Sequence, residues 1–186
     1  GQAPEVAWSA ALIEGLVATL DPARETEGNI RKAVAEVLGK APASAWSATV
    51  IERLVAALDI AHEPERRVRE AAAQALGQAP ASAWSATVIE GLVAALYPAR
   101  VIDSDVLVEA AAQALRQAPA SLIDTGVMTG FVVALSNGGR PPLEILHHAT
   151  PADARQILPL LHHLARSSSS MGPQIRATAH VLAGEV

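Results

Sequence analysis

The chain contains no cysteine and few aromatic residues: three tryptophans, one tyrosine and one phenylalanine. The absence of cysteine excludes disulfide bonds and thiolate metal sites. Lysine and arginine (14) are outnumbered by acidic residues (19), a balance opposite to that of most nucleic-acid-binding proteins. No apolar run reaches the roughly 20 residues of a membrane span, and no secretory signal is present at the start. We therefore expect a cytoplasmic protein that binds neither nucleic acid nor membrane.

Alanine is abundant, with 40 residues in a chain of 186, and it favours helix. The tryptophans Trp8, Trp46 and Trp84 each lie in the string Ala-Trp-Ser-Ala and are spaced 38 residues apart. A fourth, diverged copy spans 116–139, with Ile123 in the tryptophan position. Repetition at a fixed period of this size indicates stacked supersecondary units rather than one closed core.

Each copy has the pattern of two helices, which we call helix A and helix B. In the second copy, helix A is predicted at about 43–58, with Pro42 at its start and the tryptophan on its apolar face. This position favours a core role for the tryptophan over a stacking platform for sugars or bases. Helix B is predicted at about 64–76, with an alanine-rich buried stripe. Gly39 and Gly77 follow the two B helices, where a left-handed residue that ends the helix is expected.

The repeat divides the whole chain. We expect a single domain, 1–186, that is all-α and contains about five two-helix units. The last unit is the least regular, which is typical of a terminal cap. The expected units span about 1–38, 39–76, 77–115, 116–149 and 150–186.

The helix B strings at 30–39 and 68–77 resemble the "VRxAAAxALG" signature of bacterial HEAT repeats, also called HEAT-like or phycobilisome-lyase-type repeats. The string at 51–58 is similar to that family's "xxLxxAL" helix A. The third copy departs from this signature, because its helix B has Leu107-Val108-Glu109 in place of Val-Arg-Glu. The resemblance implies a right-handed α-solenoid with B helices on the concave side. It also implies a non-enzymatic scaffold or protein–protein interaction module, since most members of the family are binding surfaces.

The second and third copies are nearly identical in their first twenty residues, 39–58 and 77–96. They differ there at two places, one of which sets Arg53 against Gly91. The A–B connections that follow differ at most positions. This contrast fits a constant frame that carries variable contact residues along one edge, or loops that simply tolerate change.

The first of these interpretations predicts a contact surface on the A–B connections and on the B helices. Charged residues of both signs occur there, which suits a protein or peptide partner better than a polyanion. The candidate binding residues are Arg66, Arg67, Arg69, Glu70, Arg100, Asp103, Asp105 and Glu109. Of these, we expect the arginines and Glu70 of the second unit to lie outside the buried stripe of helix B.

Histidines gather in the C-terminal third, as the pairs His147-His148 and His162-His163. Glu144 precedes His147 by three residues, a spacing that di-iron helix bundles use. Such a site needs two of these motifs and further carboxylates. We therefore expect no metal and no cofactor, with Glu144, His147 and His163 as weak candidates. The alternative function is an enzyme of chromophore-lyase or hydrolase type that uses this part of the chain.

The chain opens on Gly1-Gln2-Ala3-Pro4, already in repeat register and without a polar capping unit. The first helix A therefore has an apolar flank without a partner in this chain. Large apolar patches rarely stay bare on soluble monomers. We expect either a homodimer through this uncapped repeat or a parent protein that continues upstream.

Overall fold

The computed structural model describes residues 8–96, 104–123, 125–136, 146, 151–167 and 172–184. The regular structure of these residues is helical, which confirms the expected all-α class. The α-helices are α1 (Ala10–Thr19), α2 (Gly28–Gly39), α3 (Ala48–Ala56), α4 (Arg66–Gly77), α5 (Ala86–Ala95), α6 (Ser104–Leu115), α7 (Thr125–Ser136), α8 (Pro151–Ser167) and α9 (Gly172–Gly184). Three short 3-10 helices, Ala43–Ala45, Ala81–Ala83 and Ala120–Leu122, precede α3, α5 and α7.

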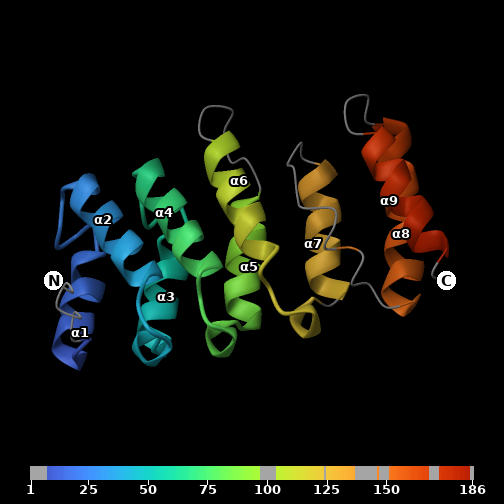
Figure 1. Cartoon of the computed structure of the whole chain (residues 1–186). Coiled ribbons are helices and arrows are strands. Elements are labelled where there is room, and N and C mark those ends of the chain that lie inside the picture. The colour runs from blue at the N-terminus through green and yellow to red at the C-terminus, as the bar shows by residue number, and fades with distance from the viewer. Residues whose placement is uncertain are drawn as a thin grey trace, which may run out of the picture.

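The helices follow one another in chain order from one end of the molecule to the other (Figure 1). The A helices α1, α3, α5 and α7 pack in succession, and so do the B helices α2, α4 and α6. At the C-terminal end, α7 packs on α8 and α8 on α9. Because each helix contacts its counterpart in the next copy, the hydrophobic core runs along the length of the molecule.

Helix A begins later than the sequence pattern predicts. The second copy's helix A, α3, begins at Ala48, because residues 43–45 form a 3-10 turn instead. Trp46 follows that turn with φ −80° and ψ 71°, which is not a helical conformation. Pro42 therefore precedes the 3-10 turn and does not lie in the first turn of the α-helix.

A serine caps each of the first three A helices. The hydroxyl of Ser47 accepts a hydrogen bond from the N–H of Val50 at 3.3 Å. Ser9 and Ser85 cap α1 and α5 in the same way. A serine oxygen satisfies one of the N–H groups that the first helical turn leaves unpaired. The helix therefore starts at this serine, although the apolar pattern continues on its N-terminal side.

The repeated tryptophan closes the turn before helix A. Trp46 and Trp84 are buried, and their indole N–H groups donate to the carbonyls of Ala41 and Ala79 at 3.2 and 3.3 Å. Ile123 is buried at the same position of the fourth copy. These contacts confirm the core role of the two tryptophans and exclude a stacking platform there.

The glycines that end the B helices are not left-handed caps, so that prediction is wrong. Gly39 and Gly77 are the last helical residues of α2 and α4, and the capping residues after them have φ near −94°. A Cβ on Gly39 would lie 2.9 Å from the Cα of Ala75, and one on Gly77 would lie 2.9 Å from the Cα of Ala114. Glycine is needed here because neighbouring B helices approach each other closely.

The last two described helices, α8 and α9, pack on each other. Helix α8 runs to Ser167, and Pro159 lies inside it. Of residues 142–149, the structure describes Leu146, which is buried. Among the described helices, none has the length and apolar character needed to cross a bilayer.

Candidate binding sites

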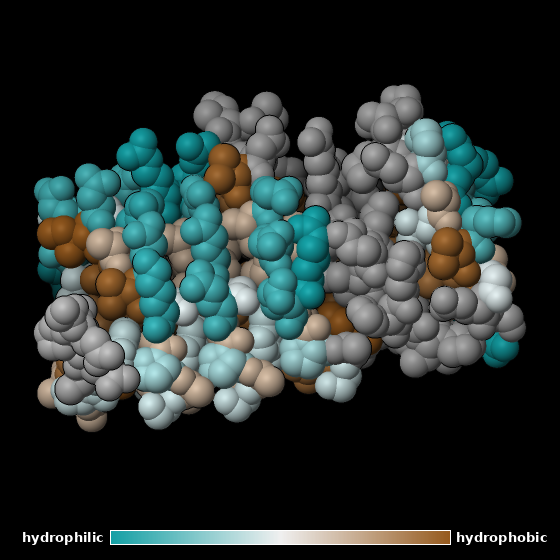
Figure 2. Space-filling model, in the orientation of Figure 1, coloured by the Kyte–Doolittle hydropathy of each residue, from teal (hydrophilic) through white to brown (hydrophobic). Residues whose placement is uncertain are grey.

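The B helices carry a polar face that repeats along the molecule. Figure 2 shows hydrophilic side chains in parallel columns over this layer. Lys32, Glu70 and Glu109 occupy equivalent positions of α2, α4 and α6. Each of these side chains pairs or bonds within its own unit: Lys32 with Glu36, Glu70 with Gln74, and Glu109 with Arg116. The face therefore presents charges of both signs in register.

Three of the predicted binding residues are exposed, as expected from the sequence. Arg66 and Arg67 are exposed at the start of α4, and Glu109 is exposed on α6. Glu70 is half-buried on α4. The carboxylate of Glu109 lies 3.7 Å from the guanidinium of Arg116.

Three other predicted residues cannot be placed. Arg100 and Asp103 fall outside the described residues. Asp105 lies within α6, but its side chain is not among those described. The third unit therefore contributes only Glu109 to the described part of the predicted surface.

Arg69 is not on the surface, which corrects its assignment as a binding residue. Its side chain is 2% exposed, and its guanidinium donates to the carbonyls of Glu63 and Pro64 at 2.8 Å. At 100° per residue, the positions four and seven residues further on share its face. These are Ala73 and Leu76, and both are fully buried. This spacing was the signal in the sequence that places Arg69 inside the stripe.

Arg31 occupies the same position in the first unit and forms a buried ion pair with the second. Its Nε and Nη2 atoms donate to both carboxylate oxygens of Glu63, at 2.8 and 2.7 Å. Its Nη1 donates to the carbonyl of Glu25 at 2.7 Å. The side chains of Arg31 and Glu63 are 2% and 1% exposed. Hydrogen bonding to Glu63 raises the pKa of Arg31, so the guanidinium remains charged.

This pair links neighbouring units through their A–B connections. Glu63 also accepts the N–H of Glu65, and its own carbonyl accepts from Arg69. A bidentate arginine–carboxylate pair has a strict geometry, so it sets the relative position of the two connections. Arg31 of the helix B signature is therefore a structural joint between units, whereas Arg69 bonds the A–B connection of its own unit.

The weak metal candidates are only partly described. Glu144 and His147 fall outside the described residues, and His163 is exposed on α8. Within the described ranges, histidine, aspartate and glutamate form no group of three able to hold a metal ion.

An apolar row lies on the outer face of α2, at the end of the molecule. Ile30 and Val37 are 45% and 43% exposed there, and Ala33 between them is exposed as well. The same positions of α4 are Val68 and Ala75, which are 0% and 1% exposed. Inside the molecule this row is covered by the preceding B helix. Figure 2 shows hydrophobic surface beside the polar columns at this end.

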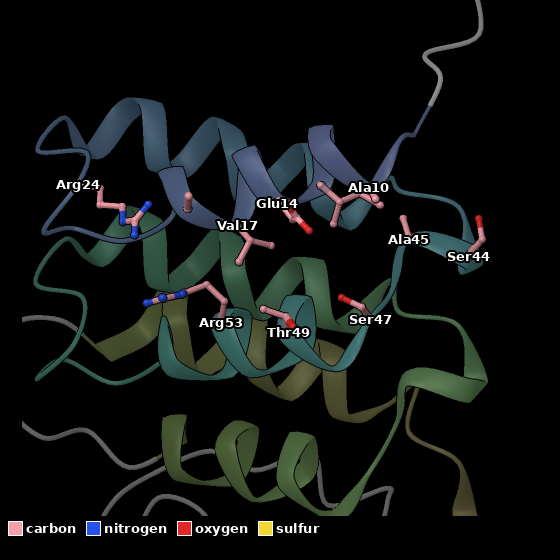
Figure 3. Close-up of a pocket in the computed structure, with 11 residues that line it drawn as sticks. Ala10, Glu14, Val17, Arg24, Ser44, Ala45, Ser47, Thr49 and Arg53 are labelled. Atoms are coloured by element: carbon pink, nitrogen blue, oxygen red, sulfur yellow. The ribbon is translucent and has the colours of Figure 1, made fainter.

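A groove lies between α1 and α3, with a volume of about 540 Å³. Its apolar wall includes Ile13 and Val17 of α1. Figure 3 shows the side chains of Arg24 and Arg53 at one end, with Glu14 further along the groove. Ser44 and Ser47 lie toward its other end, and Thr49 lies midway along it (Figure 3).

Comparison of the chain with profiles of known protein families, with curated proteins and with solved structures found no match.

Proposed function

We propose that the chain is a cytoplasmic, non-enzymatic scaffold module that binds protein or peptide partners. Its architecture would be a right-handed α-solenoid of about five HEAT-like repeats, each made of two helices. The support for this architecture is the succession of A helices and of B helices along the molecule. In such an assembly each unit contacts its neighbours, and the flanks of the stack offer long continuous surfaces.

The observation that carries the proposal is the apolar row of α2. Ile30, Ala33 and Val37 have the register of residues that stack between units elsewhere in the chain, yet here they are exposed. Burying one such valine or isoleucine side chain contributes about 1.5–3 kcal/mol. A row of this kind therefore favours a partner that supplies the missing helix face.

A second copy of this chain is the partner that fits the row best. Two copies related by a twofold axis would place Ile30 and Val37 of one α2 against the same row of the other. An isologous contact needs only one self-complementary patch, and an apolar row with alanine at its centre allows close approach. This arrangement is the homodimer through the uncapped first repeat.

The polar face of the B helices supports a second kind of contact, with protein or peptide partners. Exposed Arg66, Arg67 and Glu109 place both signs of charge there. Contacts through such a face give specificity and faster association, and they weaken with salt. We therefore expect partner binding on this face to be more salt-sensitive than association through α2.

Light scattering on the purified chain tests the dimer. At tens of micromolar we expect twice the chain mass, 38.4 kDa for a chain of 19.2 kDa. Ile30→Glu and Val37→Glu bury a charge in the contact and should give a monomer. Ile60→Glu is the matched control, because Ile60 is 46% exposed but lies in an A–B connection.

The outcome separates the alternatives directly. A wild-type chain that stays monomeric at these concentrations contradicts the dimer. A dimer that Ile30→Glu and Val37→Glu leave intact contradicts the assignment of the contact to α2. Circular dichroism of each variant shows whether the helices remain folded.

A further inference from the structure

At one position of helix A, the second copy has a different residue type from the other three copies. The four copies carry Gly15, Arg53, Gly91 and Gly130 at this position. Between 39–58 and its counterpart in the third copy, this is one of only two differences. An arginine has therefore replaced a glycine in a frame that is otherwise almost unchanged.

The glycine allows neighbouring A helices to touch. A Cβ on Gly91 of α5 would lie 2.8 Å from Cγ1 of Val55 on α3, which is too close for any real side chain. The counterpart of this contact in the first two units is Arg53 of α3 beside Val17 of α1. Both of these residues line the groove of about 540 Å³ between α1 and α3. The arginine side chain occupies the place where the helices meet elsewhere, and so it accounts for the groove.

The groove has the size and lining of a ligand site. Its volume lies within the range of about 300–1,000 Å³ that is usual for ligand pockets. Ile13, Val17 and Ala45 provide apolar surface along it, and Thr49 adds a hydroxyl. An extended peptide segment combines the apolar and hydrogen-bonding groups that such a lining accepts.

The charges at one end of the groove are unbalanced. Figure 3 shows Arg24 and Arg53 at this end, on opposite walls. Arg53 lies 3.5 Å from Asp21, and both side chains are partly exposed. Among the described residues, Arg24 has no ion-pair partner. Asp21 pairs with Arg53 and Glu14 lies further along the groove, so the guanidinium of Arg24 has capacity for a further carboxylate.

We propose that this groove binds an acidic peptide segment, with an aspartate or glutamate carboxylate between Arg24 and Arg53 and an adjacent apolar side chain against Val17. Guanidinium groups bind carboxylates through paired, charge-assisted hydrogen bonds. Asp21 and Glu14 keep negative charge close by, and this favours a singly charged carboxylate over a phosphate group. The inference rests on the proposed function and assigns the place and chemistry of one peptide contact.

A displayed library of random twelve-residue peptides tests the proposal. It is selected on the wild-type chain and, in parallel, on Arg53→Gly, which carries the residue of the other three copies. We expect peptides with an acidic residue beside an apolar one to be enriched on the wild type alone. Calorimetry then measures one enriched peptide against its amide counterpart, in which Asp or Glu is replaced by Asn or Gln.

The expected result is an affinity at least about tenfold lower for the amide peptide, for Arg53→Gly and for Arg24→Gln, because each removes one partner of a charge-assisted bond. Arg155→Ala is the matched control, since Arg155 is exposed on α8 at the other end of the molecule, and it should bind as the wild type does. Urea unfolding of each variant confirms that it is folded.

Other results overturn the proposal. These are enrichment that is equal on Arg53→Gly, enriched peptides without an acidic residue, no enrichment at all, or displacement of the peptide by inorganic phosphate at a concentration of about 10 mM. The outcome is separable from the proposed function, because Arg53→Gly leaves the apolar row of α2 unchanged. A chain that still dimerises but selects no acidic peptide would support the proposed dimer and contradict the proposed peptide site in the groove.

Discussion

Single residues in this protein have roles that depend on which neighbour they reach. The repeated tryptophan bonds a carbonyl five residues before it and fills the space under the turn. The repeated arginine of helix B reaches the A–B connections. Arg31 binds Glu63, 32 residues away, while Arg69 binds the backbone of the connection before its own helix. Both residue types stabilise joints between elements rather than bind partners.

Trp46→Ala should lower the free energy of unfolding by about 3–5 kcal/mol, because it removes a buried aromatic side chain and leaves a cavity. Urea unfolding followed by circular dichroism measures the change. Trp8→Ala is the comparison: Trp8 is only partly buried, so its loss should cost clearly less. A loss under about 1 kcal/mol for Trp46→Ala would contradict the burial.

Glu63→Ala should destabilise the chain by about 3–5 kcal/mol, because it leaves the charge of Arg31 buried without its partner. The matched control is Asp21→Ala at the partly exposed pair with Arg53, which should cost less than about 1 kcal/mol. Urea unfolding of both variants gives the comparison. Equal effects of the two substitutions would show that the Arg31–Glu63 pair is solvated.

Neighbouring helices approach to different distances, and small residues set those distances. Gly39 and Gly77 bring the B helices close together, and Ala35 of α2 and the alanines of α4 are buried. In the A layer, Gly91 allows α5 to touch Val55 of α3. Arg53 prevents the same contact between α3 and α1. The spacing of the layers is therefore encoded in a few positions.

Gly39→Ala tests this close approach. Alanine is the better helix former by about 1 kcal/mol, so a free position should gain stability from the change. At Gly39 the new Cβ would meet the backbone of Ala75, and we expect a loss of about 1–3 kcal/mol instead. Gly15→Ala is the control, because a Cβ on Gly15 has nothing within 4 Å and should stabilise the chain. Thermal and urea unfolding would show the opposite signs.

At the scale of the whole molecule, burial decreases toward the N-terminal end. The second and third tryptophans are buried, whereas Trp8 is only partly buried. Helix α2 carries an exposed apolar row whose counterpart in α4 is buried. In stacked repeats the terminal units lack one neighbour and open more readily than the internal ones.

Variants that keep one tryptophan, with the other two changed to phenylalanine, report this difference. Made in the Ile30→Glu background, they exclude protection of Trp8 by a second copy. We expect acrylamide to quench Trp8 faster than Trp46 or Trp84, because quenching requires access to the indole. Equal quenching rates for all three would show that the first unit is covered.

The helical class, the positions of most helices and the buried tryptophans were predictable from local pattern. A period of 38 residues and apolar residues at three- and four-residue steps both act within one unit, so they appear in the sequence directly. The start of helix A was missed by several residues. The apolar pattern continues on the N-terminal side of Ser47, but the helix starts at this serine because its hydroxyl caps the first turn.

The carboxylate partner of Arg31 and the need for Gly39 followed only from the packing of one unit on the next. A helical pattern shows which residues share a face, but not how closely the next helix approaches or which loop supplies a carboxylate. The groove beside Arg53 and the exposed row of Ile30 and Val37 have the same origin. Each depends on whether a neighbouring unit fills a space, and that is a property of the assembled stack rather than of any single repeat.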